Sequence, residues 1–333
     1  MSRSFSILSL GVLNAAVLMA YAQPPVATPR PAMKPAAPIS PSPPRPTGTA
    51  TQLAATPGDT LIAHAATELG RHQAIAANLR EQINLFGHQV FGKGTYLQQG
   101  RGENLKLRME IKLEHVAGRT SSVQQVSDGT NFWLLQDTGG PPRISRIDLR
   151  RVRESLARQP SPKPQTASWL AIGGLPKLLD SLDRSFRFGP VRSGRLDRLD
   201  VWIIEGDWDR AALAELAPDQ AARLKAGGPP DDSRLPEQIP NRVRLMVGRD
   251  DLFPYRIEYR RVSFENGQLP GTGDGALLVL MELVEVELNG PIDARNFIYQ
   301  PTKYDDITAT YLKGLGVSQE TARAPAKAPG LAR

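Results

Sequence analysis

"NLKLRMEIKLEH" at residues 104–115 alternates between apolar and charged side chains almost without interruption. The odd positions are apolar (Leu105, Leu107, Met109, Ile111 and Leu113) and the even ones charged (Lys106, Arg108, Glu110, Lys112 and Glu114). This two-residue period predicts a β-strand with one dry face and one wet face. The dry face must cover either a packed core or a cavity for an apolar guest.

The same alternation returns in three later segments. Their apolar positions are Val243, Leu245 and Val247, then Tyr255, Ile257 and Tyr259, and finally Val284, Val286 and Leu288. Strands that share one apolar face indicate a single sheet wrapped around something apolar, because a sheet covered on both sides lacks this alternation. We therefore predict a mainly β fold: a strongly curved antiparallel sheet, or unclosed β-barrel, covered by a few helices.

Turn residues divide the sequence into strands. Gly87 separates two strand-like segments within 77–99, and Gly92 and Gly94 suggest bends or bulges in the second of them. Asp128-Gly129 is a dipeptide typical of tight turns between strands. Together these signals predict a series of hairpins.

Other segments complete the predicted order of elements. Residues 143–152 and 293–301 have strand-like patterns, whereas the charged insert within 209–235 begins with a helical pattern. Asp59 is placed to cap a short helix at the start of the folded part.

The N-terminus has the pattern of an export signal. Arg3 precedes a short apolar run, and Ala20-Tyr21-Ala22 provides a cleavage site, so we expect cleavage after Ala22. A proline-rich stretch follows, in which ten of the 24 residues of 23–46 are proline. The expected parts of the chain are a signal peptide (1–22), a disordered tether (23–58), one folded domain (59–316) and a disordered basic tail (317–333).

Composition narrows the location and the partners. The chain has no cysteine, which excludes disulfides, thiol catalysis and the lipid-bearing cysteine of a lipoprotein. We therefore expect a free periplasmic or secreted protein, and a monomer. Its net charge of +7 suggests attraction to anionic surfaces, but a solubilising excess of charge is the preferred interpretation over a specific polyanion site. An exported chain with 6% aromatic residues is a poor candidate for binding nucleic acid.

The sequence offers no arrangement typical of an enzyme. The four histidines (His64, His72, His88 and His115) lack the spacing of metal ligands. The carboxylate pairs Asp231-Asp232, Asp250-Asp251 and Asp305-Asp306 lie in contexts where aspartate favours turns. We expect no catalysis, no metal and no cofactor, and we assign Trp133, Trp169, Trp202 and Trp208 to the core or a cavity wall.

The order of elements resembles the LolA-like family of lipoprotein carriers. The matching stretches are "VSDGTNFWLLQD" (126–137), "RISRIDLRRV" (143–152), "SWLAIGGLPKLLDSLDRSFRF" (168–188), "NRVRLMVGRDDLFPYRIEYRRV" (241–262) and "DARNFIYQPTKYDDI" (293–307). The resemblance spans roughly 59–310 and implies a bent, unclosed sheet whose concave face holds acyl chains beneath a helical lid. The tether, the 209–235 insert and the tail depart from the family, and no motif here matches its cavity arginine.

The resemblance allows residues to be assigned to the wall of the acyl-chain site and to the helical lid that covers it. The predicted wall comprises Leu105, Leu107, Met109, Ile111, Leu113, Val243, Leu245, Tyr255 and Ile257. The predicted lid carries Trp169, Leu175, Leu178, Leu179 and Leu182 on a helix, with Gly173-Gly174 as a possible hinge. We expect this site to bind an acyl chain of a lipid or lipoprotein, as a carrier or sensor. The alternative is a non-catalytic envelope protein with a filled core that docks on a partner or an anionic wall polymer.

Overall fold

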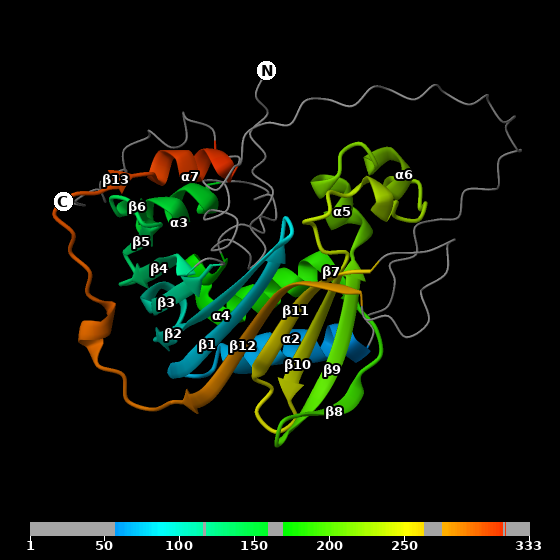
Figure 1. Ribbon diagram of the computed structural model, residues 1–333, viewed down its shortest axis with the longest axis horizontal. Coiled ribbons are helices and arrows are strands. Elements are labelled where there is room, and N and C mark those ends of the chain that lie inside the picture. Colours follow the sequence, from blue (N-terminus) through cyan, green and yellow to red (C-terminus); the bar gives the residue numbers. More distant parts are fainter. Residues whose placement is uncertain (1–56, 116–117, 159–168, 263–274, 316, 318–333) are drawn as a thin grey trace, which may run out of the picture.

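Thirteen strands form one curved sheet in the computed structural model, which describes residues 57–115, 118–158, 169–262, 275–315 and 317 (Figure 1). The strands are β1 (Ala74–Leu85), β2 (His88–Gln99), β3 (Lys106–Glu114), β4 (Thr120–Ser127), β5 (Asn131–Asp137), β6 (Arg143–Asp148), β7 (Phe186–Phe188), β8 (Arg192–Leu196), β9 (Leu199–Trp208), β10 (Arg242–Gly248), β11 (Pro254–Arg261), β12 (Ala276–Leu288) and β13 (Asp305–Asp306). The helices are α2 (Pro57–Leu69), α3 (Leu149–Ala157), α4 (Trp169–Ser185), α5 (Arg210–Leu216), α6 (Ala221–Lys225) and α7 (Thr308–Gly314).

The strand order leaves the sheet open. It runs β13-β6-β5-β4-β3-β2-β1-β12-β11-β10-β9-β7, with β8 beside β9, and the two ends of this order do not pair within the described residues. All pairings are antiparallel except the short one between β13 and β6. The predicted fold, a curved and unclosed antiparallel sheet with a few helices, is confirmed.

The alternation of residues 104–115 sets the two faces of the sheet. Leu107, Met109, Ile111 and Leu113 of β3 are each only 1% exposed, and they lie on the concave face. The charged residues between them lie on the convex face. Unbroken pairing with β2 and β4 fixes the register, since a slip of one residue would exchange the faces.

Helices α2 and α4 cover the concave face. They pack against each other, and Figure 1 shows both crossing one side of the sheet behind β1, β10, β11 and β12. Ile62, Ala65 and Leu69 of α2 join the leucines of α4 and the dry side chains of the sheet in one apolar cluster. A second cluster at the β5–β6 end is covered by α3 and α7.

The hairpin predictions are confirmed, but not the bulges. β1 and β2 meet at a turn in which Phe86 and Gly87 both have positive φ, and Asp128-Gly129 joins β4 to β5. Pairing runs without a shift through Gly92 and Gly94, so there is no bulge at either glycine. A β-carbon at Gly94 would lie 1.8 Å from the carbonyl oxygen of Glu110, and this close approach of strands explains the glycine.

Two predicted strands are wrong in part or in whole. The segment 143–152 leaves the sheet at Leu149 because Asp148 caps α3, accepting a hydrogen bond from the backbone N–H of Arg151. The segment 293–301 forms a short 3₁₀ helix (η4, Ala294–Phe297), which Asp293 caps through the N–H of Arg295.

The ends of the described structure lie close to the predicted domain boundaries. α2 begins at Pro57, so Asp59 lies inside the helix, where its Oδ1 accepts a hydrogen bond from the N–H of Phe188. Val317 is buried in the second cluster. The signal peptide, most of the tether and the rest of the tail lie outside the described residues. No helix in the described ranges is long and apolar enough to cross a membrane.

The two faces of β3 can be tested with one pair of neighbours. Ile111→Asp should lower the free energy of unfolding by several kcal/mol, because it buries an unpaired charge. Lys112→Asp, on the exposed side, should change it by about 0.5 kcal/mol or less. Urea denaturation of both variants measures the difference, and equal costs would show that the strand faces are wrongly assigned.

Candidate functional site

The predicted wall residues come together on the concave face. Leu107, Met109, Ile111, Leu113, Val243, Leu245 and Ile257 all belong to the main apolar cluster, against which Tyr255 packs while partly buried. Leu105 is also buried, but it precedes β3 and lies outside this cluster. The sheet register therefore assembles a wall from strands that are far apart in sequence.

The predicted lid lies over this wall. Leu175, Leu178, Leu179 and Leu182 of α4 are at most 2% exposed and belong to the same cluster. Trp169 is the first residue of α4, and its side chain lies outside the described part of the structure. Wall and lid are in contact as a packed cluster, and an enclosed hollow between them stays a prediction.

The predicted hinge coincides with a break in α4. Gly174 has φ 62° and ψ −159°, which is not a helical conformation, and Pro176 follows inside the same helix. Proline lacks the N–H of a helical hydrogen bond, and glycine adopts positive φ at little cost. A β-carbon at Gly174 would lie 2.1 Å from Oε1 of Gln98, so the site has no room for a side chain.

Two polar side chains of β2 hold the break against the sheet. The N–H of Leu175 lies 3.0 Å from the hydroxyl of Tyr96 and 3.3 Å from Oε1 of Gln98. Tyr96 in turn donates to Oε1 of Gln98 at 2.6 Å, and burial raises the pKa of Tyr96 above its usual range. The lid is thus attached to the wall at one defined polar point. Neither residue was predicted from the sequence, although each occupies an inward position of an alternating strand.

A buried carboxyl lies on the same dry face. Glu81 of β1 lies between Leu79 and Ile83 in the alternation, is 6% exposed, and has no hydrogen-bond partner for its Oε2. Burial raises the pKa of Glu81 from 4.5 to about 8, so the side chain is mostly protonated at neutral pH. This residue was also missed, although its inward position follows from the pattern of β1.

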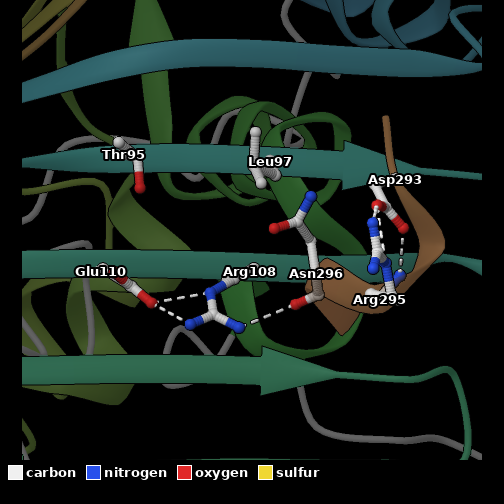
Figure 2. A pocket seen from close by; sticks show the side chains of 7 residues that line it. All are labelled: Thr95, Leu97, Arg108, Glu110, Asp293, Arg295 and Asn296. Atoms are coloured by element: carbon white, nitrogen blue, oxygen red, sulfur yellow. Dashed lines mark hydrogen bonds and ion pairs between the residues drawn. The ribbon is translucent and has the colours of Figure 1, made fainter. Parts of the chain in front are cut away.

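The convex face carries an open polar groove instead. Its volume is about 630 Å³, and it lies between β2, β3 and η4, lined by Thr95, Leu97, Arg108, Glu110, Asp293, Arg295 and Asn296 (Figure 2). Arg108 is held there by Glu110 and by the carbonyl oxygen of Asn296, 2.9 Å from its Nη1. Because its charged groups are paired with each other, this groove is poorly suited to an acyl chain.

The residues considered for catalysis have structural contacts. Asp251 accepts hydrogen bonds from the N–H of Phe253 and the hydroxyl of Tyr255, and Asp306 accepts one from the N–H of Thr308. Within the described ranges, no three His, Asp or Glu side chains are grouped closely enough to hold a metal ion.

The tryptophans occupy different environments. Trp208 packs in the main cluster and donates to the carbonyl oxygen of Pro240 at 2.7 Å. Trp202 is half-buried beneath the guanidinium of Arg249, and Trp133 is buried on the convex side against Tyr304.

Comparisons with known proteins find likeness in structure only. No family model and no curated protein matches the sequence. Among solved structures, a DUF1329 family protein from Desulfovibrio piger is 13% identical over 73% of this chain and 98% of its own, with a TM-score of 0.31. A putative outer membrane lipoprotein-sorting protein domain from Vibrio parahaemolyticus is 11% identical over 72% and 95%, with a TM-score of 0.29. A LolA superfamily protein from Nitrosomonas europaea is 11% identical over 73% and 98%, with a TM-score of 0.25.

The observed architecture agrees with the fold predicted from the sequence. One bent, unclosed sheet with helices over its concave face is the architecture that the sequence resemblance implied. The predicted architecture is therefore confirmed.

Glu81 should make stability depend on pH. Its pKa is raised in the folded state, so the folded protein binds this proton more tightly than the unfolded chain. The free energy of unfolding should therefore fall as pH rises from 4.5 to about 8, by at most about 1.4 kcal/mol per pH unit from this group.

Denaturation of wild type and Glu81→Gln at several pH values isolates this effect. Between about pH 5 and 8, the unfolding free energy of the variant should rise relative to that of wild type. This range lies roughly between the pKa of Glu81 in the unfolded chain and its pKa in the folded protein. Glu114→Gln, at an exposed position of β3, serves as the control for loss of one carboxyl. A difference that does not change with pH would contradict the assignment of Glu81.

Proposed function

We propose that this chain is an exported protein of the bacterial envelope that holds an acyl chain of a lipid or lipoprotein between the concave face and α4. It would act as a carrier or sensor, as a monomer, and without catalysis or a cofactor. The observation that carries the proposal is that wall and lid form one apolar cluster, although the lid helix is broken and attached at a polar point.

The wall is able to persist when the lid moves. β3 is paired along its length with β2 on one side and β4 on the other, so its conformation is held by the sheet and not by α4. An apolar strand face without its cover would be exposed to water, which is unfavourable. A ligand that replaces the cover removes this cost.

An acyl chain meets this requirement. The contacts between Leu178, Leu179 and the dry side chains of the sheet are apolar and therefore non-directional. Methylene groups can substitute for them, and each buried CH₂ contributes about 0.8 kcal/mol. Gly174 supplies a break at which the part of α4 that carries Leu178 and Leu179 can change its angle to the sheet.

The direct test is titration with an environment-sensitive fluorescent fatty acid. The folded wild type should bind the probe saturably, and Leu178→Asp should weaken binding because a charge would face the chain. Arg184→Asp, at an exposed position of the same helix, is the control and should bind as wild type does. Circular dichroism of each variant checks that the sheet remains folded.

The proposal would be contradicted if the wild-type protein showed no binding of acyl chains. If the folded protein binds no such probe and releases no lipid on organic extraction, the acyl-chain function is wrong. The chain would then be better explained as a docking protein of the envelope with a filled core.

A further inference from the structure

The buried polar groups of the concave face include two that find no hydrogen-bond partner among the described residues. They are Oε2 of Glu81 and the hydroxyl of Tyr259, whose side chains are 6% and 2% exposed. A buried polar group that is left unpaired costs about 1–3 kcal/mol, so an apolar side chain at either position would make a more stable fold. The stability of the fold therefore does not explain why two polar side chains occupy these positions among apolar neighbours.

The sheet register places the two groups near each other. Glu81 of β1 pairs with Met281 of β12, which pairs with Ile257 of β11, and Tyr259 lies two residues further along β11. Strand spacing and rise per residue put their α-carbons roughly 12 Å apart on one face. Both side chains are long enough to reach toward a common guest above Met281.

The surroundings favour the uncharged forms of both groups. On its other side Glu81 pairs with Gly92, above which Ile111 and Leu113 fill the space that a side chain would take. Burial raises the pKa of Tyr259 above its usual range, as it raises that of Glu81. A neutral carboxyl and a phenol are both hydrogen-bond donors. The hydrogen bonds that they donate are stronger in an apolar environment than in water.

We infer that Glu81 and Tyr259 form the polar end of the concave site, where their O–H groups donate hydrogen bonds to the carbonyl oxygen at the head of an acyl chain. This rests on the proposed function and specifies its ligand: an acyl ester, amide or acid, as distinct from a plain hydrocarbon. The carbonyl satisfies the two donors that the protein leaves unpaired, and the methylenes of the chain pack against the leucines.

Competition between matched ligands tests the inference. A bound fluorescent fatty acid is displaced with methyl dodecanoate or with an alkane of similar length, which differ in the ester group. Wild type should prefer the ester. Glu81→Leu should bind the ester about tenfold more weakly and the alkane no worse, and Tyr259→Phe should show the same selective loss to a smaller degree.

Two variants separate this effect from a general defect. Glu81→Gln retains a donor and should keep the ester preference, whereas Gln82→Leu, on the opposite face, should leave both affinities unchanged. Glu81→Leu should also unfold at a higher urea concentration than wild type, because it removes an unpaired buried carboxyl. Weaker ester binding in a more stable protein cannot be attributed to unfolding.

Three results would overturn the inference. If Glu81→Leu weakens the binding of ester and alkane equally, or weakens neither, the carboxyl of Glu81 does not recognise the carbonyl of the ligand. A preference for dodecylamine that Glu81→Gln abolishes would show instead that an ionised carboxylate binds a cation. If wild type binds neither chain, the proposed function itself fails, and this inference fails with it.

Discussion

The structure depends on the burial of one face of a single sheet. Alternating strands such as β3 give that face a continuous apolar surface, and within the described residues no second sheet packs against it. Burial of apolar surface is the main favourable term in folding, so this face requires a cover. Helices α2 and α4 provide it, and contacts of this kind are strong in sum but not directional. We propose that this combination allows a ligand to replace part of the cover.

Polar side chains interrupt the apolar concave face at two places. Tyr96 and Gln98 are satisfied by each other and by the N–H of Leu175, so they fix where the lid is attached. Glu81 and Tyr259 have unpaired atoms at another place on the face. The first pair attaches α4 to the sheet, whereas the second reduces the stability of the fold, and we propose that a ligand completes it.

The sequence was most informative where structure is set by local pattern. The alternation at 104–115 correctly gave a strand and both of its faces, and the spacing of Leu175, Leu178 and Leu182 gave the lid helix. The sequence was least informative where the pairing of distant strands determines which side chains are neighbours. β1 lies beside β12, some two hundred residues later, so the neighbours of Glu81 could not be read locally. Asp148 and Asp293 begin helical turns inside apparent strand patterns because their side chains cap free N–H groups, which an apolar period does not reveal.

Three methionines allow a direct test of where a ligand lies. Met109 and Met281 are buried on the concave face, whereas Met246 lies on the opposite face of β10. Protein with ¹³C-labelled methionine methyl groups can be saturated with a dodecanoyl ester and examined by NMR for nuclear Overhauser effects from the chain. Our account predicts such effects at Met109 and Met281 and none at Met246. Effects at Met246 alone, or at none of the three while the ester is bound, would contradict binding in the concave face.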